Sequence, residues 1–350
     1  MTDTPDGLAA LGWSNFFLSQ LEDDEAGALR PARVTAVHRD RLEVAGPGTP
    51  AAVPPLAGTD DEAATVGDWL LLAADSARAI RRLERKSIFL RRAAGHGRSV
   101  QLIAANVDTL FIVTSCNQDF NPARLERYLA LAHEAGVMPV MVLTKADLVD
   151  DAGAYRRAAE ALMPGLLVEC VNALDPESAR PLAMWCGPGQ TVALVGSSGV
   201  GKSTLVNTLG EAAAQATQDI REDDARGRHT TSGRSMHRLA AGGWLIDTPG
   251  MRELQLTGAE AGIGELFADI EDLAAACRFS DCAHEGEPGC AIAGALLAGK
   301  LDAERLDRYR KLLAEDRRNT ESLAERRSRA KKLGRFYRSA QSEARRNKGE

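Results

Sequence analysis

Hydrophobic and polar positions along the chain follow three patterns in succession, and each pattern predicts a different kind of structure. From residue 33 onward, short apolar runs alternate with polar residues and are separated by glycine and proline, at residues 34–37, 42–44, 69–72 and 88–90. Several short strands within about 60 residues predict a small β-barrel, and we expect an OB-fold. The residues before it, 1–29, read as an amphipathic lead-in.

The second pattern, which begins near residue 97, alternates buried strands with amphipathic helices. Apolar runs at 107–113 and 137–143 predict two buried strands, and apolar residues at helical spacing predict a helix at 122–135 between them. Further strands are predicted at 166–171, 191–195 and 244–246. This alternation predicts a doubly wound α/β domain, in which ligands gather at the carboxyl ends of the strands. The third pattern, after residue 301, is helical and increasingly basic.

A short stretch between a predicted strand and a predicted helix has the pattern GxxxxGK[ST], which forms a phosphate-binding loop in that context. Glycines let backbone N–H groups turn towards a phosphate, and the positive end of the new helix adds to the attraction. We expect Lys202 to reach the β- and γ-phosphates and the Ser203 hydroxyl to bind Mg²⁺. The predicted loop comprises Gly196, Ser197, Ser198, Gly199, Val200, Gly201, Lys202, Ser203 and Thr204.

Four residues after the strand at 137–143 indicate the base of the nucleotide: Thr144, Lys145, Ala146 and Asp147. One carboxylate can accept hydrogen bonds from both N1–H and the N2 amine of guanine. Adenine offers no such pair, so Asp147 favours GTP over ATP. We expect Lys145 to lie along the base plane. Thr144 stands where the usual GTPase signature has asparagine, and its shorter side chain is expected to bridge less and to lower base affinity.

Two later segments fit the switches of a GTPase. Asp247 ends a predicted strand and forms the pattern DxxG with Gly250, whose N–H would sense the γ-phosphate while the carboxylate holds Mg²⁺ through water. In the polar loop at 227–231, Thr231 would close over Mg²⁺ and the γ-phosphate, with Thr230 as the other candidate. The predicted Mg²⁺ ligands are therefore Ser203 and Thr231.

These motifs stand in an unusual order. In an ordinary small GTPase the phosphate loop comes first, then DxxG, then the base motif, whereas here Asp147 precedes the phosphate loop. A circular permutation changes the order while it leaves the strands and the site in place, because domain termini often lie close together. The sequence thus predicts a circularly permuted GTPase domain.

Three cysteines and one histidine fall within one short window, as Cys277, Cys282, His284 and Cys290. Three thiolates and one imidazole make a closed tetrahedral set that suits one structural Zn²⁺. The other cysteines are scattered and read as buried apolar residues, at Cys116, Cys170 and Cys186.

The net charge of −6 hides an asymmetry. Residues 317–350 hold twelve Lys or Arg and four Asp or Glu, a charge of +8, so the rest of the chain carries −14. A second basic stretch lies at residues 81–98. Such segments predict a polyanion partner, most simply RNA, and the alternatives are a solvated helix face and a charged strand edge. No apolar run approaches the roughly 20 residues that cross a bilayer, and the acidic N-terminus is no secretory signal, so we expect a cytoplasmic protein. We also expect a monomer.

Together these features resemble the bacterial ribosome small-subunit-dependent GTPase A family (RsgA, also called YjeQ). The resemblance covers about residues 30–300 and includes the motif order, the loop at 227–231, the zinc pattern and the segments 85–87, 105–108 and 125–128. It implies an OB-fold, a permuted GTPase and a zinc domain that act in late maturation of the small ribosomal subunit. It also implies binding to that subunit and its rRNA, which stimulates slow GTP hydrolysis.

The resulting prediction is a multidomain chain. It has a lead-in at 1–29, an OB-fold barrel at 30–96, a circularly permuted α/β P-loop GTPase domain at 97–258 and an α-helical zinc-binding, basic domain at 259–350. Two alternatives stay open: an RNA-binding assembly factor whose hydrolysis is incidental, and an ATP-dependent phosphotransferase.

The sequence also bears on catalysis. Met251 occupies the place where a glutamine usually orients the attacking water, and an apolar side chain cannot do so. His229 is the candidate for that role beside Lys202 and Thr231, because an imidazole can orient or accept a proton from water. Its alternative is a loop histidine with a structural or rRNA-contacting role.

Overall fold

The computed structural model describes residues 7–25, 27–56, 63–74, 76, 78–92, 100–210, 234–247 and 256–320. The chain divides into two compact units, Met1–Gln255 and Leu256–Glu350, and each is described by itself. Within the described residues, no helix is both long and apolar enough to cross a membrane.

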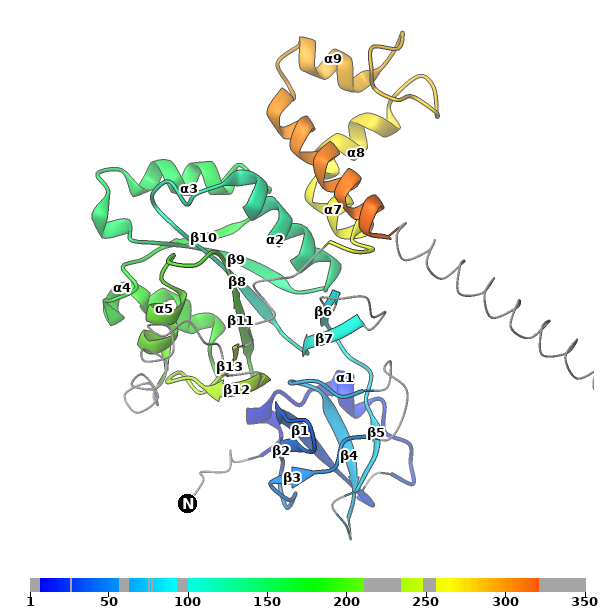
Figure 1. The fold of residues 1–350 in the computed structure, drawn as a ribbon, viewed down its shortest axis with the longest axis vertical. Helices are drawn as coiled ribbons and strands as arrows, with labels where there is room; N and C mark the ends of the chain where they lie inside the picture. Colours follow the sequence, from blue (N-terminus) through cyan, green and yellow to red (C-terminus); the bar gives the residue numbers. More distant parts are fainter. Residues whose placement is uncertain are drawn as a thin grey trace, which may run out of the picture. The chain divides into compact units, whose positions relative to one another are not determined.

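The first unit begins with five antiparallel strands around one hydrophobic core, in the order β3-β2-β1-β4-β5 (Figure 1). Alternate residues of β1 and β4, among them Ala32, Val34, Leu70 and Leu72, point into this core, as the period of a strand requires. The strands are β1 Leu29–Val37, β2 Leu42–Ala45, β3 Ala52–Val53, β4 Trp69–Ala73 and β5 Ala79–Arg82.

The lead-in packs aromatic rings on Trp69 of β4, on the face of that strand opposite to Leu70 and Leu72. It contains a 3-10 turn, η1 Ala9–Leu11, and one helical turn, α1 Asn15–Leu18. The ring centroids of Trp13 and Trp69 lie 4.8 Å apart, and those of Phe17 and Trp69 lie 5.7 Å apart. The lead-in therefore completes the packing of β4.

A two-stranded antiparallel ribbon, β6 Ile88–Arg92 and β7 Val100–Ala105, leads to a mostly parallel sheet. Its strands follow the order β10-β9-β8-β11-β13 and are parallel, and β12 adds an antiparallel edge beside β13. The pairing of β12 with β1 then joins this sheet to the first five strands. The strands are β8 Thr109–Ser115, β9 Met138–Thr144, β10 Leu167–Cys170, β11 Thr191–Val195, β12 Arg234–Arg238 and β13 Trp244–Asp247.

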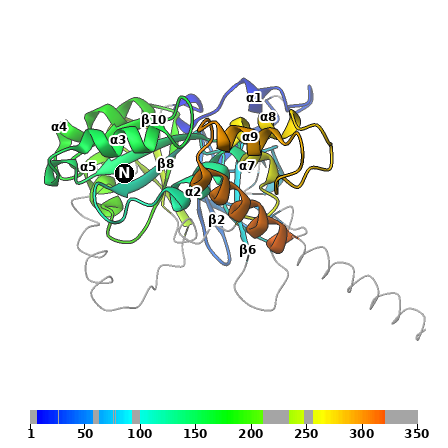
Figure 2. The same cartoon turned by 90° about the horizontal axis from the view of Figure 1, so that it is seen from above.

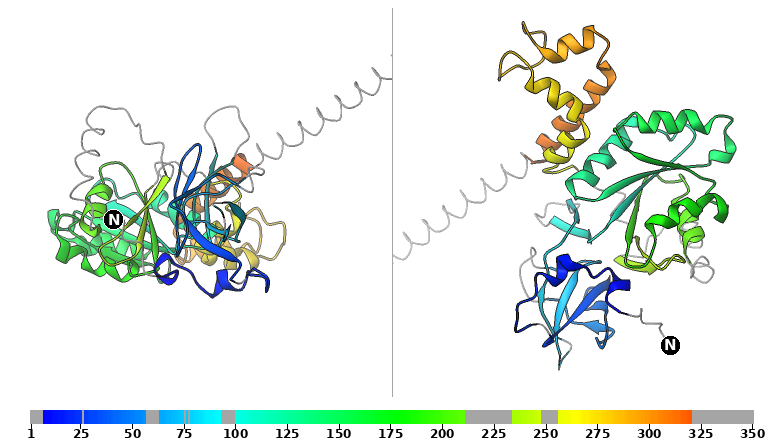
Figure 3. Two further views of the ribbon diagram at one scale, coloured as in Figure 1. Left: turned by 90° about the horizontal axis from the view of Figure 1, so that it is seen from below. Right: turned by 180° about the vertical axis from the view of Figure 1, so that it is seen from behind.

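Helices cover both faces of the parallel sheet (Figures 1 and 3). On one face, Phe111, Val113 and Val192 pack with Leu182 and Leu205 in a single buried cluster. The other face carries α2 and α3. Because both faces are covered, β8 is buried along its whole length, as parallel strands in such sheets are. The helical segments are α2 Pro122–Glu134, η2 Ala146–Leu148, α3 Ala152–Glu160, α4 Pro176–Ala179, η3 Arg180–Trp185 and α5 Lys202–Leu209.

The second unit is helical in its described part (Figure 2). It contains α7 Glu260–Leu266, α8 Ala268–Ala275, α9 Ala291–Leu297 and a further helix at residues 303–320. The ring of Phe267 packs on Tyr309, and Arg305 stacks over the same Phe267 ring at 4.7 Å and pairs with Asp269 at 2.9 Å. These contacts join the last helix to α7 and α8.

Candidate nucleotide site and metal centre

The phosphate loop connects β11 to α5 with the geometry that the sequence predicts. Its glycines have positive φ, 144° at Gly196, 80° at Gly199 and 94° at Gly201, in the region that favours glycine. A Cβ at Gly196 would lie 2.1 Å from the carbonyl oxygen of Val113 on the neighbouring strand. Only glycine fits there, because the loop must pass directly over β8 before it turns into the helix.

Lys202 opens α5 and folds back over the loop. Its Nζ donates hydrogen bonds to the carbonyl oxygen of Gly196, at 2.8 Å, and to that of Ser197. The ammonium group therefore lies within the curve of the loop, at the N-terminus of a helix. Both the charge and the helix end attract an anion to this position.

The predicted base motif lies at the carboxyl end of β9, beside the phosphate loop. Lys145 adopts φ 57°, and its Nζ donates to the carbonyl oxygen of Gly199 at 2.9 Å. The N–H of Ala146 donates to the carbonyl oxygen of Val171 at 3.4 Å, which connects this motif to the loop after β10. Thr208 of α5 donates to the carbonyl oxygen of Ala173 at 2.6 Å. Three loops from β9, β10 and β11 thus meet at one edge of the sheet.

Asp147 lies on η2 and is exposed. Within the described residues, no hydrogen bond engages its carboxylate. An exposed carboxylate is less costly to leave unsatisfied than a buried one, and the role of Asp147 in selecting guanine stays a prediction.

Thr144 connects the end of β8 to the phosphate loop, and the lower base affinity expected from its short side chain stays a prediction. Its hydroxyl lies 2.5 Å from the carbonyl oxygen of Val200 in the phosphate loop and 3.2 Å from that of Thr114 at the end of β8. The side chain is fully buried. Threonine reaches both carbonyl groups because β9 ends directly beside β8 and the phosphate loop passes next to its last residue.

Of the predicted switch residues, only the backbone of Asp247 is described, at the last position of β13. Because β13 lies next to β11, the strand end that carries Asp247 adjoins the strand that carries the phosphate loop. Gly250, Met251, His229, Thr230 and Thr231 lie outside the described residues.

The four predicted metal ligands converge in the second unit. One ligand atom from each of Cys277, Cys282, His284 and Cys290 lies within 4.8 Å of all the others. The Nδ1 atom of His284 is 3.5 Å from Sγ of Cys277 and 3.7 Å from Sγ of Cys290. Three thiols and one imidazole at these separations could hold one metal ion.

Backbone groups support this cluster. The N–H of Ala291 donates to Sγ of Cys277 at 3.4 Å, and the N–H of Ala293 donates to Sγ of Cys290 at 3.4 Å, at the start of α9. Burial raises the pKa of the Cys277 thiol, but hydrogen bonds, first those from the N–H groups of Ala291 and Ile292, outweigh that effect and lower it. Burial acts in the opposite direction at Cys282 and raises the pKa of its thiol to about 12, so within the cluster the thiolate, the form that binds metal, is favoured at Cys277.

The remaining cysteines differ. Cys116 and Cys186 are buried, and burial raises the pKa of their thiols to about 11 and about 12. Cys170 is half-buried. At neutral pH the two buried thiols stay protonated and pack as small apolar side chains.

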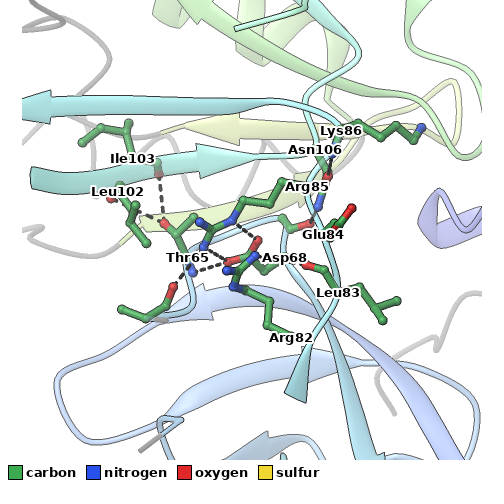
Figure 4. A network of polar contacts seen from close by, with 12 residues as sticks. Thr65, Asp68, Arg82, Leu83, Glu84, Arg85, Lys86, Leu102, Ile103 and Asn106 are labelled. Carbon is green, nitrogen blue, oxygen red and sulfur yellow. Dashed lines mark hydrogen bonds and ion pairs between the residues drawn. The ribbon is translucent and has the colours of Figure 1, made fainter. Parts of the chain in front are cut away.

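The basic stretch that suggested an RNA contact is largely occupied by structural contacts. Arg85 forms a two-pronged ion pair with the buried Asp68, at 2.7 and 2.8 Å, and Asp68 also accepts the N–H of Thr65 at 2.7 Å (Figure 4). Arg81 pairs with Glu25 in the same two-pronged manner, and Arg91 donates to Gln101. These arginines hold β5, β6 and the lead-in in place.

Asn106 and Arg33 join the first five strands to the parallel sheet, a role that the sequence analysis missed. The Asn106 side chain accepts the N–H of Lys86 at 2.9 Å and donates to the carbonyl oxygen of Gly67 at 2.9 Å (Figure 4). Arg33 is buried and donates to the carbonyl oxygens of Leu11, Gly67 and Asn106. Burial lowers the pKa of Arg33 to about 10, so it stays charged at neutral pH. The position of Arg33 among apolar residues of a predicted strand was the feature of the sequence that could have indicated this role.

The fold and loops define a class of protein. The strand that carries the phosphate loop lies in the centre of the sheet, yet the strand that carries the base motif precedes it in the chain. This is the arrangement of a circularly permuted GTPase, an enzyme that hydrolyses GTP. A family model described as RsgA GTPase matches residues 82–257, and the chain belongs to that family.

Similar proteins agree with this assignment. A Mesorhizobium japonicum protein named small ribosomal subunit biogenesis GTPase RsgA is 57% identical over 91% of this chain and 93% of its own. The Vibrio parahaemolyticus protein named RsgA 2, with the same description, is 50% identical over 99% and 96% of the two chains.

Among solved structures, YjeQ from Thermotoga maritima has 24% identity, a TM-score of 0.61, and coverage of 82% of this chain and 98% of its own. YloQ, described as a circularly permuted GTPase, has 23% identity, a TM-score of 0.58 and coverage of 83% and 95%. At these identities the two structures support the fold. The family model and the curated relatives confirm the GTPase assignment that the sequence predicts, and the fold with its strand order confirms the permutation.

Proposed function

We propose that this protein is a GTPase of small-ribosomal-subunit maturation, whose hydrolysis of GTP to GDP and phosphate is stimulated by that subunit. The observation that carries the proposal is the meeting of three nucleotide loops at the carboxyl edge of a permuted sheet. Relatives with about half or more of their residues identical are named for biogenesis of that subunit. The basic composition of residues 317–350 supports an rRNA partner.

The nucleotide roles follow from GTPase chemistry. The loop Gly196–Thr204 would cradle the phosphates, Lys202 would neutralise the β- and γ-phosphates, and Ser203 with Thr231 would bind the Mg²⁺ that accompanies GTP. Asp247 and Gly250 would act as the second switch. In the base pocket, Asp147 would accept from guanine, beside Thr144, Lys145 and Ala146. Mg²⁺ supplies charge stabilisation at the transferring phosphoryl group.

For the attacking water we propose His229, because Met251 has no polar atom with which to orient it. Replacing His229 by alanine is expected to abolish subunit-stimulated turnover while GTP affinity changes little. Stimulated turnover at the level of the unaltered protein would refute this role.

The cluster of Cys277, Cys282, His284 and Cys290 is proposed to hold one structural Zn²⁺, since a thiolate-rich tetrahedral set with no open position suits that ion. The first five strands are proposed to form an OB-fold barrel, with domain limits at 30–96, 97–258 and 259–350. The metal would hold the loop between α8 and α9 in one conformation.

The decisive experiment compares hydrolysis of GTP and ATP by the full chain, with and without purified small ribosomal subunits. We expect the protein to hydrolyse GTP but not ATP. Without subunits the hydrolysis of GTP should be slow, and with subunits it should be at least tenfold faster. A rate that does not respond to subunits, together with tight subunit binding, would favour an RNA-binding factor with incidental hydrolysis. Preference for ATP would favour the phosphotransferase. The protein is further proposed to act in the cytoplasm. It is also proposed to be a monomer, and light scattering, which measures the molar mass in solution, tests that state.

A further inference from the structure

Arg124 places a second cation at the phosphate loop. It lies in the first turn of α2, and its Nη1 donates a hydrogen bond to the hydroxyl of Ser197. The backbone there is fixed, because the Asn121 side chain accepts the N–H of Arg124 at 3.0 Å and Pro122 occupies the first helical position. The helix follows β8, which is the direct neighbour of β11, so the guanidinium extends from a rigid element towards the loop.

Two cations therefore meet at one residue. Lys202 donates to the carbonyl oxygen of Ser197, and Arg124 donates to its hydroxyl. Arginine is charged at all relevant pH values, so the two groups repel each other unless negative charge lies between them. Among the residues that the structure describes, Arg124 forms no ion pair with a carboxylate. Such a pair of cations suits a ligand with several negative charges.

The position of Lys202 indicates which phosphate Arg124 would meet. In a loop of this kind the backbone N–H groups surround the α- and β-phosphates, and the lysine reaches the β- and γ-phosphates. Because both cations contact Ser197, the guanidinium lies near the ammonium group of Lys202. That ammonium group is the one expected to meet the γ-phosphate.

We propose that Arg124 donates a hydrogen bond to the γ-phosphate of bound GTP and stabilises the charge of the phosphoryl group during hydrolysis. This inference rests on the proposed GTPase function and adds a residue to its site. In the reaction, water oxygen forms a bond to the γ-phosphorus and the bond to the bridging oxygen breaks. GDP leaves with the electron pair, and the water proton passes to the phosphate product. Arginine suits this task because its planar fork matches phosphate oxygens.

The test measures affinity for GDP and for a non-hydrolysable GTP analogue, using full-length protein with Mg²⁺. Arg124→Ala should lower affinity for the analogue about 10- to 100-fold, the range of one charge-assisted hydrogen bond. Affinity for GDP should change less than twofold, because GDP has no γ-phosphate. Arg124→Lys should recover part of the loss, and kcat for GTP should fall with Arg124→Ala.

Three further variants make the result specific. Arg124→Gln keeps a polar hydrogen-bonding side chain but removes the charge and the length of arginine, and it should lose affinity as Arg124→Ala does. Ser197→Ala removes the hydroxyl partner but leaves the guanidinium, so the ratio of analogue to GDP affinity should stay within twofold. Arg157→Ala removes an exposed cation on α3 and should bind both nucleotides like the unaltered protein.

Equal loss of affinity for GDP and the analogue in Arg124→Ala would mean that the arginine only braces the loop, and the inference would be wrong. Unchanged affinity for both would also overturn it. These results are distinct from failure of the proposed function, for which the unaltered protein would itself show no GTP hydrolysis with or without small subunits.

Discussion

Replacing Asp68 by alanine should destabilise the first unit by about 3 to 5 kcal/mol, the usual result of breaking a buried ion pair. The Asp68 side chain is fully buried, and the Arg85 side chain that it binds is only 12% exposed. The substitution would remove three acceptor contacts of 2.7, 2.8 and 2.7 Å at once. It would also leave a guanidinium and the N–H of Thr65 without that acceptor.

A double-mutant cycle separates the pair from its surroundings. The combined change of Asp68→Leu and Arg85→Met removes both charges, so it should cost less than the sum of the two single changes, with a coupling energy of about 2 kcal/mol or more. The exposed pair of Arg180 with Glu177, at 77% and 78% exposure, supplies the control. Arg180→Ala should cost below about 1 kcal/mol.

Tryptophan fluorescence during urea unfolding is a suitable assay, because all four tryptophans lie in the first unit and Trp69 adjoins Asp68 in the chain. The midpoint and slope of each transition give the free energy of unfolding. If Asp68→Ala cost no more than Arg180→Ala, the network in Figure 4 would not hold the first five strands to their neighbours, and the reasoning would be refuted.

Three other predictions concern the loop, pH and the metal. Gly196→Ala should weaken GTP binding at least tenfold, because its Cβ would lie 2.1 Å from the carbonyl oxygen of Val113; near-normal affinity by nucleotide titration would contradict this. The hydrogen bonds from Arg81 lower the pKa of Glu25 from 4.5 to about 2, so its contribution to stability is complete above pH 4.5 and disappears as the pH falls through 2. The urea midpoint should therefore decrease more between pH 7 and pH 3 in the unaltered protein than in Glu25→Gln. An equal decrease in the two proteins would mean that the pair of Glu25 with Arg81 does not contribute to stability. Cys282→Ser should reduce bound zinc from one ion per chain, measured by elemental analysis after dialysis, and full retention would exclude this ligand.

Local patterns in the sequence were sufficient to predict the nucleotide loop and the metal cluster. The loop needs glycines, a lysine and a hydroxyl at fixed spacing between a strand and a helix, and all of these are contiguous from Gly196 to Ser203. The four metal ligands likewise fall within fourteen consecutive residues, from Cys277 to Cys290. When the residues of a site are close together in the sequence, they are also close together in most folds that the segment can adopt, so the site can be predicted from the local pattern.

The roles of charged and polar residues whose partners lie far away in the chain could not be predicted from the sequence. Seven basic residues between 81 and 98 suggested an RNA surface, but Arg85 binds Asp68, seventeen positions earlier, and Arg81 binds Glu25, fifty-six positions earlier. A sequence pattern cannot distinguish an arginine that is free to bind phosphate from one that is neutralised by a distant carboxylate. Thr144 is a similar case, because its partners are the carbonyl oxygens of Thr114 and Val200, thirty and fifty-six positions away.

The sequence by itself thus determined the phosphate loop, the cluster of four candidate metal ligands and the permuted order of the motifs, and it predicted the carboxylate that would select guanine. These depend on residue type and local spacing. Only the tertiary structure decided which cations remain at the nucleotide site and which are used in structural pairs. That outcome depends on distances between residues such as Arg124 and Ser197, which lie seventy-three positions apart and meet only because β8 and β11 are neighbours in the sheet.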